Sequence, residues 1–224
     1  MLILAVDTTT PAGSVALLRD GALLAECNAE SGLTHSERLL ATVDAVLAAA
    51  KATLADVDAF AVAAGPGSFT GIRIGLGTVK SFCFASGKPG LSVSTLEALA
   101  LKGAVEGGRL IAPMLDAKKG EVYAALFAAR GEALVEIVPQ GAYRPEAFLA
   151  RLPARRVIRL LGNGALLYRD QIAARLGRRG LVVARTPFIG HEVGRLGFAA
   201  LAAGKGVPGA ALQPFYHRKS QAEE

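Results

Sequence analysis

The sequence is poor in the residues that build disulfides and metal sites. Two cysteines, Cys27 and Cys83, and three histidines, His35, His191 and His217, occur among 224 residues. Both cysteines stand in apolar surroundings, which favours buried thiols in a reducing compartment over a disulfide. The histidines are far apart, and no H-x-x-x-H, H-E-x-x-H or C-x-x-C pattern is present. We therefore expect no metal site of these kinds.

Long apolar runs are also missing, although 52% of the residues are hydrophobic. No run reaches the roughly 20 residues that a membrane-spanning helix needs. The opening residues, Leu2 to Asp7, carry no basic cluster and reach an acid early, so they indicate a first strand and not a signal peptide. We expect a cytoplasmic protein with a substantial core and no membrane association.

The common nucleotide-binding and hydrolase motifs are absent too. A glycine-rich loop, Gly65-Pro66-Gly67-Ser68-Phe69-Thr70-Gly71, stands between a predicted strand and a predicted helix. No Lys-Ser/Thr follows a G-x-x-x-x-G frame, and the last glycine comes one residue too late for the dinucleotide fingerprint. No G-x-S-x-G is found, and Ser36 and Ser68 are interpreted as cap or turn residues.

Hydrophobic patterning predicts alternating strands and helices in the first half. Asp20-Gly21 is a strong hairpin signal between two strands. Thr34 and Glu37 form a capping box before an amphipathic helix. The predicted elements are strands over 2–7, 14–18 and 22–28, a helix over 35–50, a strand over 57–64, a helix over 70–86, a strand over 91–93 and a helix over 95–101.

The second half partly repeats this order, with Asp116 placed after its first strand as Asp7 is after the first strand of the chain. Its predicted elements are strands over 109–115, 121–128 and 133–138 and helices near 145–151, 164–176 and 191–203. This order predicts a duplicated α/β fold with a mixed sheet and packed helices in each half. We place the subdomains at 1–103 and 104–224, with the last helix a candidate to return to the first subdomain.

Charge is divided unevenly between these halves. Residues 1–103 carry a net charge of −2, and residues 104–224 carry +8. A basic half suits a polyanion such as RNA. The alternative is a solvated, arginine-rich surface, because the basic residues are scattered and their tightest groups are not interleaved with aromatic residues.

Asp7, Thr8 and Thr9 end the first predicted strand. A carboxylate there suits a hard cation, and turn amides suit an anion. The alternative is that Asp7 only caps the amides of its own turn. Two interpretations also remain for the glycine-rich loop. Its amides could bind phosphate at the start of the helix, or the loop could be only a tight turn from strand to helix.

Five segments together resemble the TsaB-type (YeaZ-type) proteins of tRNA threonylcarbamoyladenosine biosynthesis. The most specific is Gly65-Pro-Gly-Ser-Phe-Thr-Gly-Ile-Arg-Ile-Gly75. The others are residues 4–9 together with 14–17, then 35–40, 116–123 and 214–219, and they occur in the family's order. Lys118-Lys119 departs from the family, in which arginine is common at this place.

The resemblance implies an actin-like, Hsp70-related (ASKHA) fold of two subdomains, the second reduced. It also implies a non-catalytic subunit of the complex that forms N6-threonylcarbamoyladenosine at position 37 of tRNAs reading ANN codons. The expected partners are a TsaD-type catalytic paralogue, a TsaE-type ATPase and, through the complex, tRNA. ATP and metal are expected on those partners, so no cofactor is assigned to this chain. The phosphate-site residues are then vestigial: Asp7, Thr8, Thr9, Gly65, Gly67 and Ser68.

The helices over 35–50 and 70–86 are expected to form the docking surface for the TsaD-type partner. Gly71 and Gly75 share one face of the second helix, where glycine costs about 1 kcal/mol against alanine, so close approach of a partner helix is expected there. The alternative is that both helices only pack on their own sheet. The predicted interface residues are His35, Leu39, Val43, Leu47, Gly71, Ile72, Gly75 and Val79. The same surface predicts a homodimer when the chain is alone.

Two other functions remain open at this point. A small actin-fold ATPase or kinase acting alone would use Asp7 and Asp116 as metal-facing acids. A plain RNA-binding module would use the basic second half and would bind tRNA with strong salt dependence.

Overall fold

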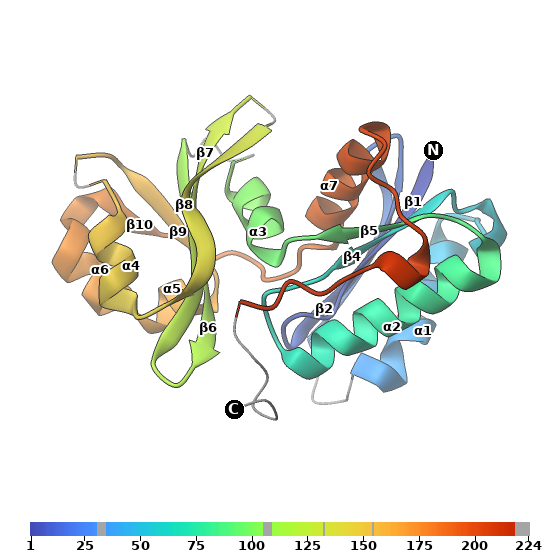
Figure 1. Ribbon diagram of the computed structural model, residues 1–224, viewed down its shortest axis with the longest axis horizontal. Helices are drawn as coiled ribbons and strands as arrows, with labels where there is room; N and C mark the ends of the chain where they lie inside the picture. Colours follow the sequence, from blue (N-terminus) through green and yellow to red (C-terminus); the bar gives the residue numbers. More distant parts are fainter. Residues whose placement is uncertain (31–34, 105–108, 132, 154, 218–224) are drawn as a thin grey trace. The chain divides into compact units, whose positions relative to one another are not determined.

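The chain folds into two α/β units in the computed structural model, which describes residues 1–30, 35–104, 109–131, 133–153 and 155–217 (Figure 1). Unit 1 comprises residues 1–95 and 188–215, and unit 2 comprises residues 96–187 and 216–224. The sequence placed the division at 103, with the last helix a candidate to return to the first subdomain. The structure divides the chain after residue 95 instead, and the last helix belongs to unit 1.

The glycines of two helices explain this difference. Helix α7 (Gly190–Ala202) packs on the sheet of unit 1, where a β-carbon at Gly194 would clash with Leu18 and one at Gly197 would lie 2.6 Å from the β-carbon of Ala61. Helix α3 (Thr95–Ala104) packs in unit 2, where a β-carbon at Gly103 would lie 2.7 Å from Leu161. Bare backbone lets each helix approach its sheet closely, and this fit cannot be read from hydrophobic periodicity.

Unit 1 is built on a mixed sheet whose described strands follow the order β3-β2-β1-β4-β5. These strands are β1 (Leu2–Asp7), β2 (Ala12–Arg19), β3 (Ala22–Glu30), β4 (Ala59–Ala63) and β5 (Gly90–Val93). Strands β1 to β3 form the predicted antiparallel meander, and β1, β4 and β5 are parallel. Asp20 and Gly21 both have positive φ, 50° and 81°, which confirms the predicted hairpin turn.

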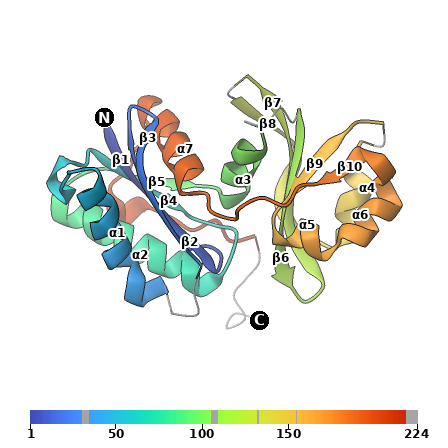
Figure 2. The ribbon, with the colours of Figure 1, turned by 180° about the vertical axis from the view of Figure 1, so that it is seen from behind.

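Helices cover both faces of this sheet. Helices α1 (His35–Ala49) and α2 (Phe69–Ser86) lie on one face, and α7 lies on the other (Figures 1 and 2). The core between the sheet and the first pair includes Phe60, Val62 and Leu76. The capping box predicted for α1 falls outside the described residues at Thr34, and the structure does not describe the Glu37 side chain.

Two short 3-10 helices complete unit 1. One is η1 (Leu54–Asp56), and the other is η3 (Gly209–Ala211), which packs against α2. After η3 the chain runs along the sheet edge to Phe215, whose amide donates to the Ala64 carbonyl at 2.8 Å. The C-terminal segment is therefore tied to the start of the glycine-rich loop.

Unit 2 repeats the plan, with described strands in the order β10-β9-β6-β7-β8. They are β6 (Leu110–Lys118), β7 (Glu121–Arg130), β8 (Ala133–Tyr143), β9 (Ile158–Leu161) and β10 (Gly180–Val182). The first three are antiparallel, and β6, β9 and β10 are parallel, as in unit 1. The duplication predicted from the order of elements is confirmed by this shared topology.

The helices of unit 2 also differ in detail from the prediction. Helix α4 (Pro145–Arg151) has the predicted bounds. The helix predicted over 164–176 is two helices, α5 (Asn163–Leu167) and α6 (Arg169–Leu176), separated at Tyr168 with φ −104° and ψ 23°, and η2 (Gly177–Arg179) follows. Helices α4 and α6 cover one sheet face around a core that includes Met114, Leu126 and Phe148, and α3 covers the other (Figure 1). The strands β9 and β10 were missed because each is too short to show a period.

Within the described residues, none of the helices has the length and the apolar character required to cross a membrane.

Candidate functional site

The turn after β1 is closed by its own hydrogen bonds. Oδ1 of Asp7 accepts from the Thr9 amide at 2.9 Å and from the Thr9 hydroxyl at 2.7 Å. Asp7, Thr8 and Thr9 are each at most 1% exposed. A carboxylate that accepts from the amide two residues ahead is an Asx turn, so this part of the site has the cap geometry considered as the alternative.

The glycine-rich loop packs directly on that turn. The Ser68 amide donates to the Thr9 carbonyl at 2.7 Å. A β-carbon at Gly67 would clash with Thr9, and one at Gly71 would clash with the Thr8 carbonyl oxygen. These two glycines are therefore required by the close approach of two segments of this chain.

The helix start behind the loop is capped from within. Ser68 is the N-cap of α2: its hydroxyl accepts from the Gly71 amide at 3.3 Å, and its carbonyl accepts from the Ile72 amide at 2.8 Å. The Thr8 hydroxyl donates to the Gly71 carbonyl at 2.7 Å. At this helix start the amides of Gly71 and Ile72 thus already have an acceptor in Ser68.

Gly65 lies at the other end of the loop, under the returning C-terminal segment. Its φ is +117°, its peptide bond to Pro66 is cis, and its carbonyl accepts from the Thr95 amide at 2.8 Å. A β-carbon here would lie 2.8 Å from the Phe215 carbonyl oxygen. The structure therefore brings all six predicted phosphate-site residues together, and they contact one another and the chain around them.

A small cavity lies between this turn and α1. It is lined by Asp7, Thr8, residues 13–15, Ala29 and, from α1, Arg38, Leu39 and Thr42, and its volume is about 20 Å³. Such a volume holds about one water molecule. Pockets that hold drug-sized ligands or cofactors measure roughly 300–1,000 Å³, so this cavity does not accommodate a nucleotide.

The carboxylate of Asp116, the second predicted acid, is already bound by a residue of its own hairpin. Its carboxylate accepts from the Lys118 amide at 2.8 Å and pairs with the Lys118 ammonium at 2.6 Å. Partial burial alone raises the pKa of Asp116, but the hydrogen bonds and charge of Lys118 together hold it below its ordinary value. Asp116 is therefore ionised at neutral pH.

Seven of the eight predicted interface residues lie inside unit 1, and their placement was wrong. Leu39, Val43, Leu47, Ile72 and Val79 are at most 7% exposed and belong to the core beneath α1 and α2. The sheet needs an apolar cover, and the apolar stripes of both helices supply it. The alternative considered for these helices, that they pack on their own sheet, accounts for these residues.

The same correction applies to Gly75 of α2. A β-carbon at Gly75 would lie 2.5 Å from the Thr8 hydroxyl oxygen and 3.4 Å from Val62, so Gly75 faces the β1–β2 turn and not a partner. The His35 side chain lies outside the described part of the chain.

Other apolar residues of α1 and α2 are exposed, and we call the exposed sides of these two helices the α1–α2 surface. On α2, Phe84 is 93% exposed and Phe69 is 36% exposed, with the Arg73 guanidinium 4.0 Å from the Phe69 ring centroid. On α1, Leu40 is 57% exposed. The rest of the exposed α1 residues are mostly small: Ala41, Asp44, Ala45, Ala48 and Ala49. The exposure of Phe84 could have been predicted from the sequence, because this residue lies off the apolar stripe of α2 that covers the sheet.

Comparisons with known proteins agree with this geometry. The family model described as "TsaD: tRNA N6-adenosine threonylcarbamoyltransferase" matches residues 29–183. The "tRNA threonylcarbamoyladenosine biosynthesis protein TsaB" of Bacillus subtilis (strain 168) is 33% identical over 183 residues, which cover 81% of this chain and 80% of that protein. The solved structure of YeaZ from Pseudomonas aeruginosa superposes with a TM-score of 0.83 and 32% identity, over 96% of this chain and 99% of that one.

A more distant neighbour bears on the fold alone. The ROK hexokinase of Thermus thermophilus matches with a TM-score of 0.54 at 12% identity, over 91% of this chain and 100% of that one. Together with the repeated strand order of the two units, this likeness confirms the predicted actin-like duplicated fold.

Proposed function

Because the chain belongs to the TsaB (YeaZ) family of tRNA threonylcarbamoyladenosine biosynthesis proteins, we propose that it is the non-catalytic subunit of the complex that forms N6-threonylcarbamoyladenosine at position 37 of tRNAs reading ANN codons. In this proposal it scaffolds and activates a TsaD-type catalytic paralogue, and a TsaE-type ATPase completes the assembly. The observation that carries the non-catalytic role is the closed loop at the β1–β2 turn.

Phosphate binding through three of the amides here would have to replace bonds that already exist. The amides of Thr9, Ser68 and Gly71 have acceptors within the chain. Exchanging one hydrogen bond for another contributes little net free energy to binding. Separating the loop from the β1–β2 turn would also expose polar groups that are now buried and hydrogen-bonded. We therefore expect the isolated chain to bind ATP weakly or not at all.

The α1–α2 surface supports the docking part of the proposal. Phe84 is an aromatic side chain with almost no contact to its own unit, as an interface anchor would be in an uncomplexed subunit. The exposed alanines of α1 permit a second helix to approach closely. A stable contact of this kind buries about 1,200–2,000 Å² in total, which two helices on each partner can supply.

The test is the affinity of purified variants for the TsaD-type protein of the same organism, measured by calorimetry. Phe84→Asp is expected to weaken binding about 10- to 100-fold, because a charge replaces an aromatic anchor that the proposed complex would bury. The matched control is Leu167→Asp, which places the same charge at an exposed leucine of unit 2 that is 59% exposed. It is expected to leave the affinity unchanged.

Equal affinity of Phe84→Asp and the native chain would exclude the α1–α2 surface as the docking site. Turnover of ATP by the isolated native chain would overturn the non-catalytic role, and it would support the alternative of a small ATPase acting alone.

A further inference from the structure

Positive charge is concentrated in unit 2. By the division seen in the structure, unit 1 carries 8 basic and 9 acidic residues, and unit 2 carries 17 basic and 10 acidic residues. The imbalance is greatest over residues 144–187, which contain ten arginines and only two acids, Glu146 and Asp170. An ordinary soluble surface mixes both signs, so this segment departs from the usual arrangement.

The strand register brings several of these arginines to one edge of the unit 2 sheet. Gly180 pairs with Ile158, and Arg159 pairs with Ile111, so the parallel strands β10, β9 and β6 begin side by side. The antiparallel strand β7 ends at the same edge, since Leu110 pairs with Ala128.

Each of these four strands carries arginine at that edge. Arg178 and Arg179 immediately precede β10, and Arg155 and Arg156 stand two or three residues before β9. Arg109 precedes β6, and Arg130 is the last residue of β7. We call these six residues the arginine edge. Neighbouring strands lie about 4.8 Å apart, so the edge spans about 14 Å at the backbone and more at the guanidinium groups.

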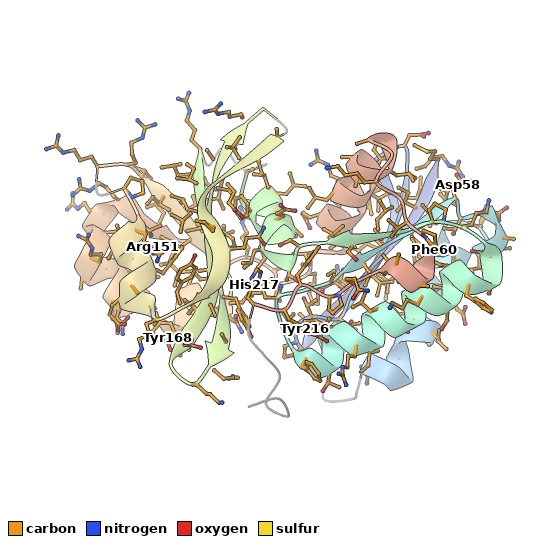
Figure 3. The ribbon with its side chains drawn as sticks, viewed as in Figure 1. Asp58, Phe60, Arg151, Tyr168, Tyr216 and His217 are labelled. Atoms are coloured by element: carbon orange, nitrogen blue, oxygen red, sulfur yellow. The ribbon has the colours of Figure 1, made fainter. Side chains whose placement is uncertain are left out.

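The six side chains are available to a ligand. All six residues are exposed, and none forms an ion pair with an acid of the described residues. In Figure 3, nitrogen-tipped side chains stand out from the upper part of unit 2. Glu106 and Glu132, the nearest acids in sequence, lie outside the described part of the chain. Like charges at this spacing repel one another, and a polyanion would relieve that repulsion.

We propose that the arginine edge binds the phosphate backbone of RNA, and this inference rests on the proposed function, which supplies tRNA as the RNA of the complex. The planar guanidinium group matches phosphate geometry and can donate two hydrogen bonds to it. Residues 153–159 and 177–181 contain no aromatic side chain on which a base could stack. The edge therefore positions an RNA helix through its backbone and does not read its sequence.

The test measures tRNA binding to the assembled complex of this chain with its TsaD-type partner. The probe is a fluorescently labelled transcript of a tRNA that reads an ANN codon, titrated by anisotropy between 50 and 200 mM salt, a range in which phosphate contacts are strongly salt-dependent. Arg155→Gln with Arg178→Gln is expected to weaken binding about 10-fold and to reduce the slope of log K against log salt by about 2.

The matched control removes the same charge from the opposite edge of the same sheet. Lys119 lies in the β6–β7 turn, and Arg144 follows β8, whose last residue pairs with Val122. Both are exposed, and the nine residues of β6 place them about 30 Å from the arginine edge. Lys119→Gln with Arg144→Gln is expected to change the affinity less than 2-fold.

The outcomes separate this inference from the proposed function. Equal effects of the two double variants would show that only net charge matters and would overturn the assignment of the edge. If the double variant Arg155→Gln with Arg178→Gln keeps the native tRNA affinity but no longer binds the TsaE-type ATPase, the arginine edge binds a protein and not RNA. If the native chain does not bind the TsaD-type protein at all, the proposed function itself fails.

Discussion

At the scale of single residues, the glycines of α2 show how position decides the role of one residue type. Gly71 and Gly75 face the β1–β2 turn, where a β-carbon would meet Thr8. Gly77 lies on the exposed side of the same helix, and a β-carbon there would have no described atom from outside the helix within 4 Å. The first two glycines are needed for packing, and the third only lowers helix propensity.

We therefore predict opposite effects for two substitutions in one helix. Gly71→Ala is expected to lower the free energy of unfolding by about 2–3 kcal/mol, because the Thr8 backbone would have to shift. Gly77→Ala is expected to raise it by about 0.5–1 kcal/mol through helix propensity. Urea denaturation of both variants and the native chain measures the difference. Similar stability of the two variants would contradict the packing of Gly71 on Thr8.

At the scale of elements, α7 is positioned by side chains from strands more than 160 residues away. The Gly190 amide donates to the Ser14 hydroxyl at 2.9 Å, and the His191 amide donates to Oε1 of Glu26 at 3.1 Å. Glu26 also brings negative charge to the positive end of the helix. Strands β2 and β3 thus cap the helix that closes the second face of their own sheet.

We predict that Glu26→Ala lowers stability by about 1–2 kcal/mol and speeds amide hydrogen exchange in the first turn of α7. Glu26→Gln keeps an acceptor oxygen but removes the charge, so it is expected to cost less than half as much. Hydrogen exchange followed by NMR at the His191 amide distinguishes a local effect from global unfolding. Unaltered exchange in Glu26→Ala would exclude the cap.

At the scale of the whole molecule, two units of the same topology present different surfaces. Unit 1 exposes apolar residues on α1 and α2, and unit 2 exposes the arginine edge. An exposed apolar surface of this kind tends to be covered by a partner. In the absence of the proposed TsaD-type partner, a second copy of the chain is the available cover.

We accordingly predict that the purified chain forms a homodimer through the α1–α2 surface. Light scattering at increasing protein concentration is expected to give the dimer mass for the native chain and the monomer mass for Phe84→Asp. A native chain that stays monomeric at high concentration would contradict this prediction. A dimer that persists in Phe84→Asp would place the contact elsewhere.

Much of the architecture was predictable from local patterns. The opening meander, the Asp20-Gly21 turn, the extents of α2 and α4 and the duplicated order all follow from period, turn chemistry and spacing. These features depend on neighbours in sequence, and the sequence by itself determines them.

Only the tertiary structure decided what those residues contact. A run of apolar and small residues shows that a helix has a face to cover, but it does not show whether the cover is its own sheet, a turn or a partner. Gly75 packs against the β1–β2 turn and Val79 is buried in the core of unit 1, whereas Phe84 is exposed. The arginine edge likewise exists only because strand pairing brings together residues from 109 to 179. Contacts between segments far apart in sequence depend on how the elements are packed, and local periodicity contains no information about that packing.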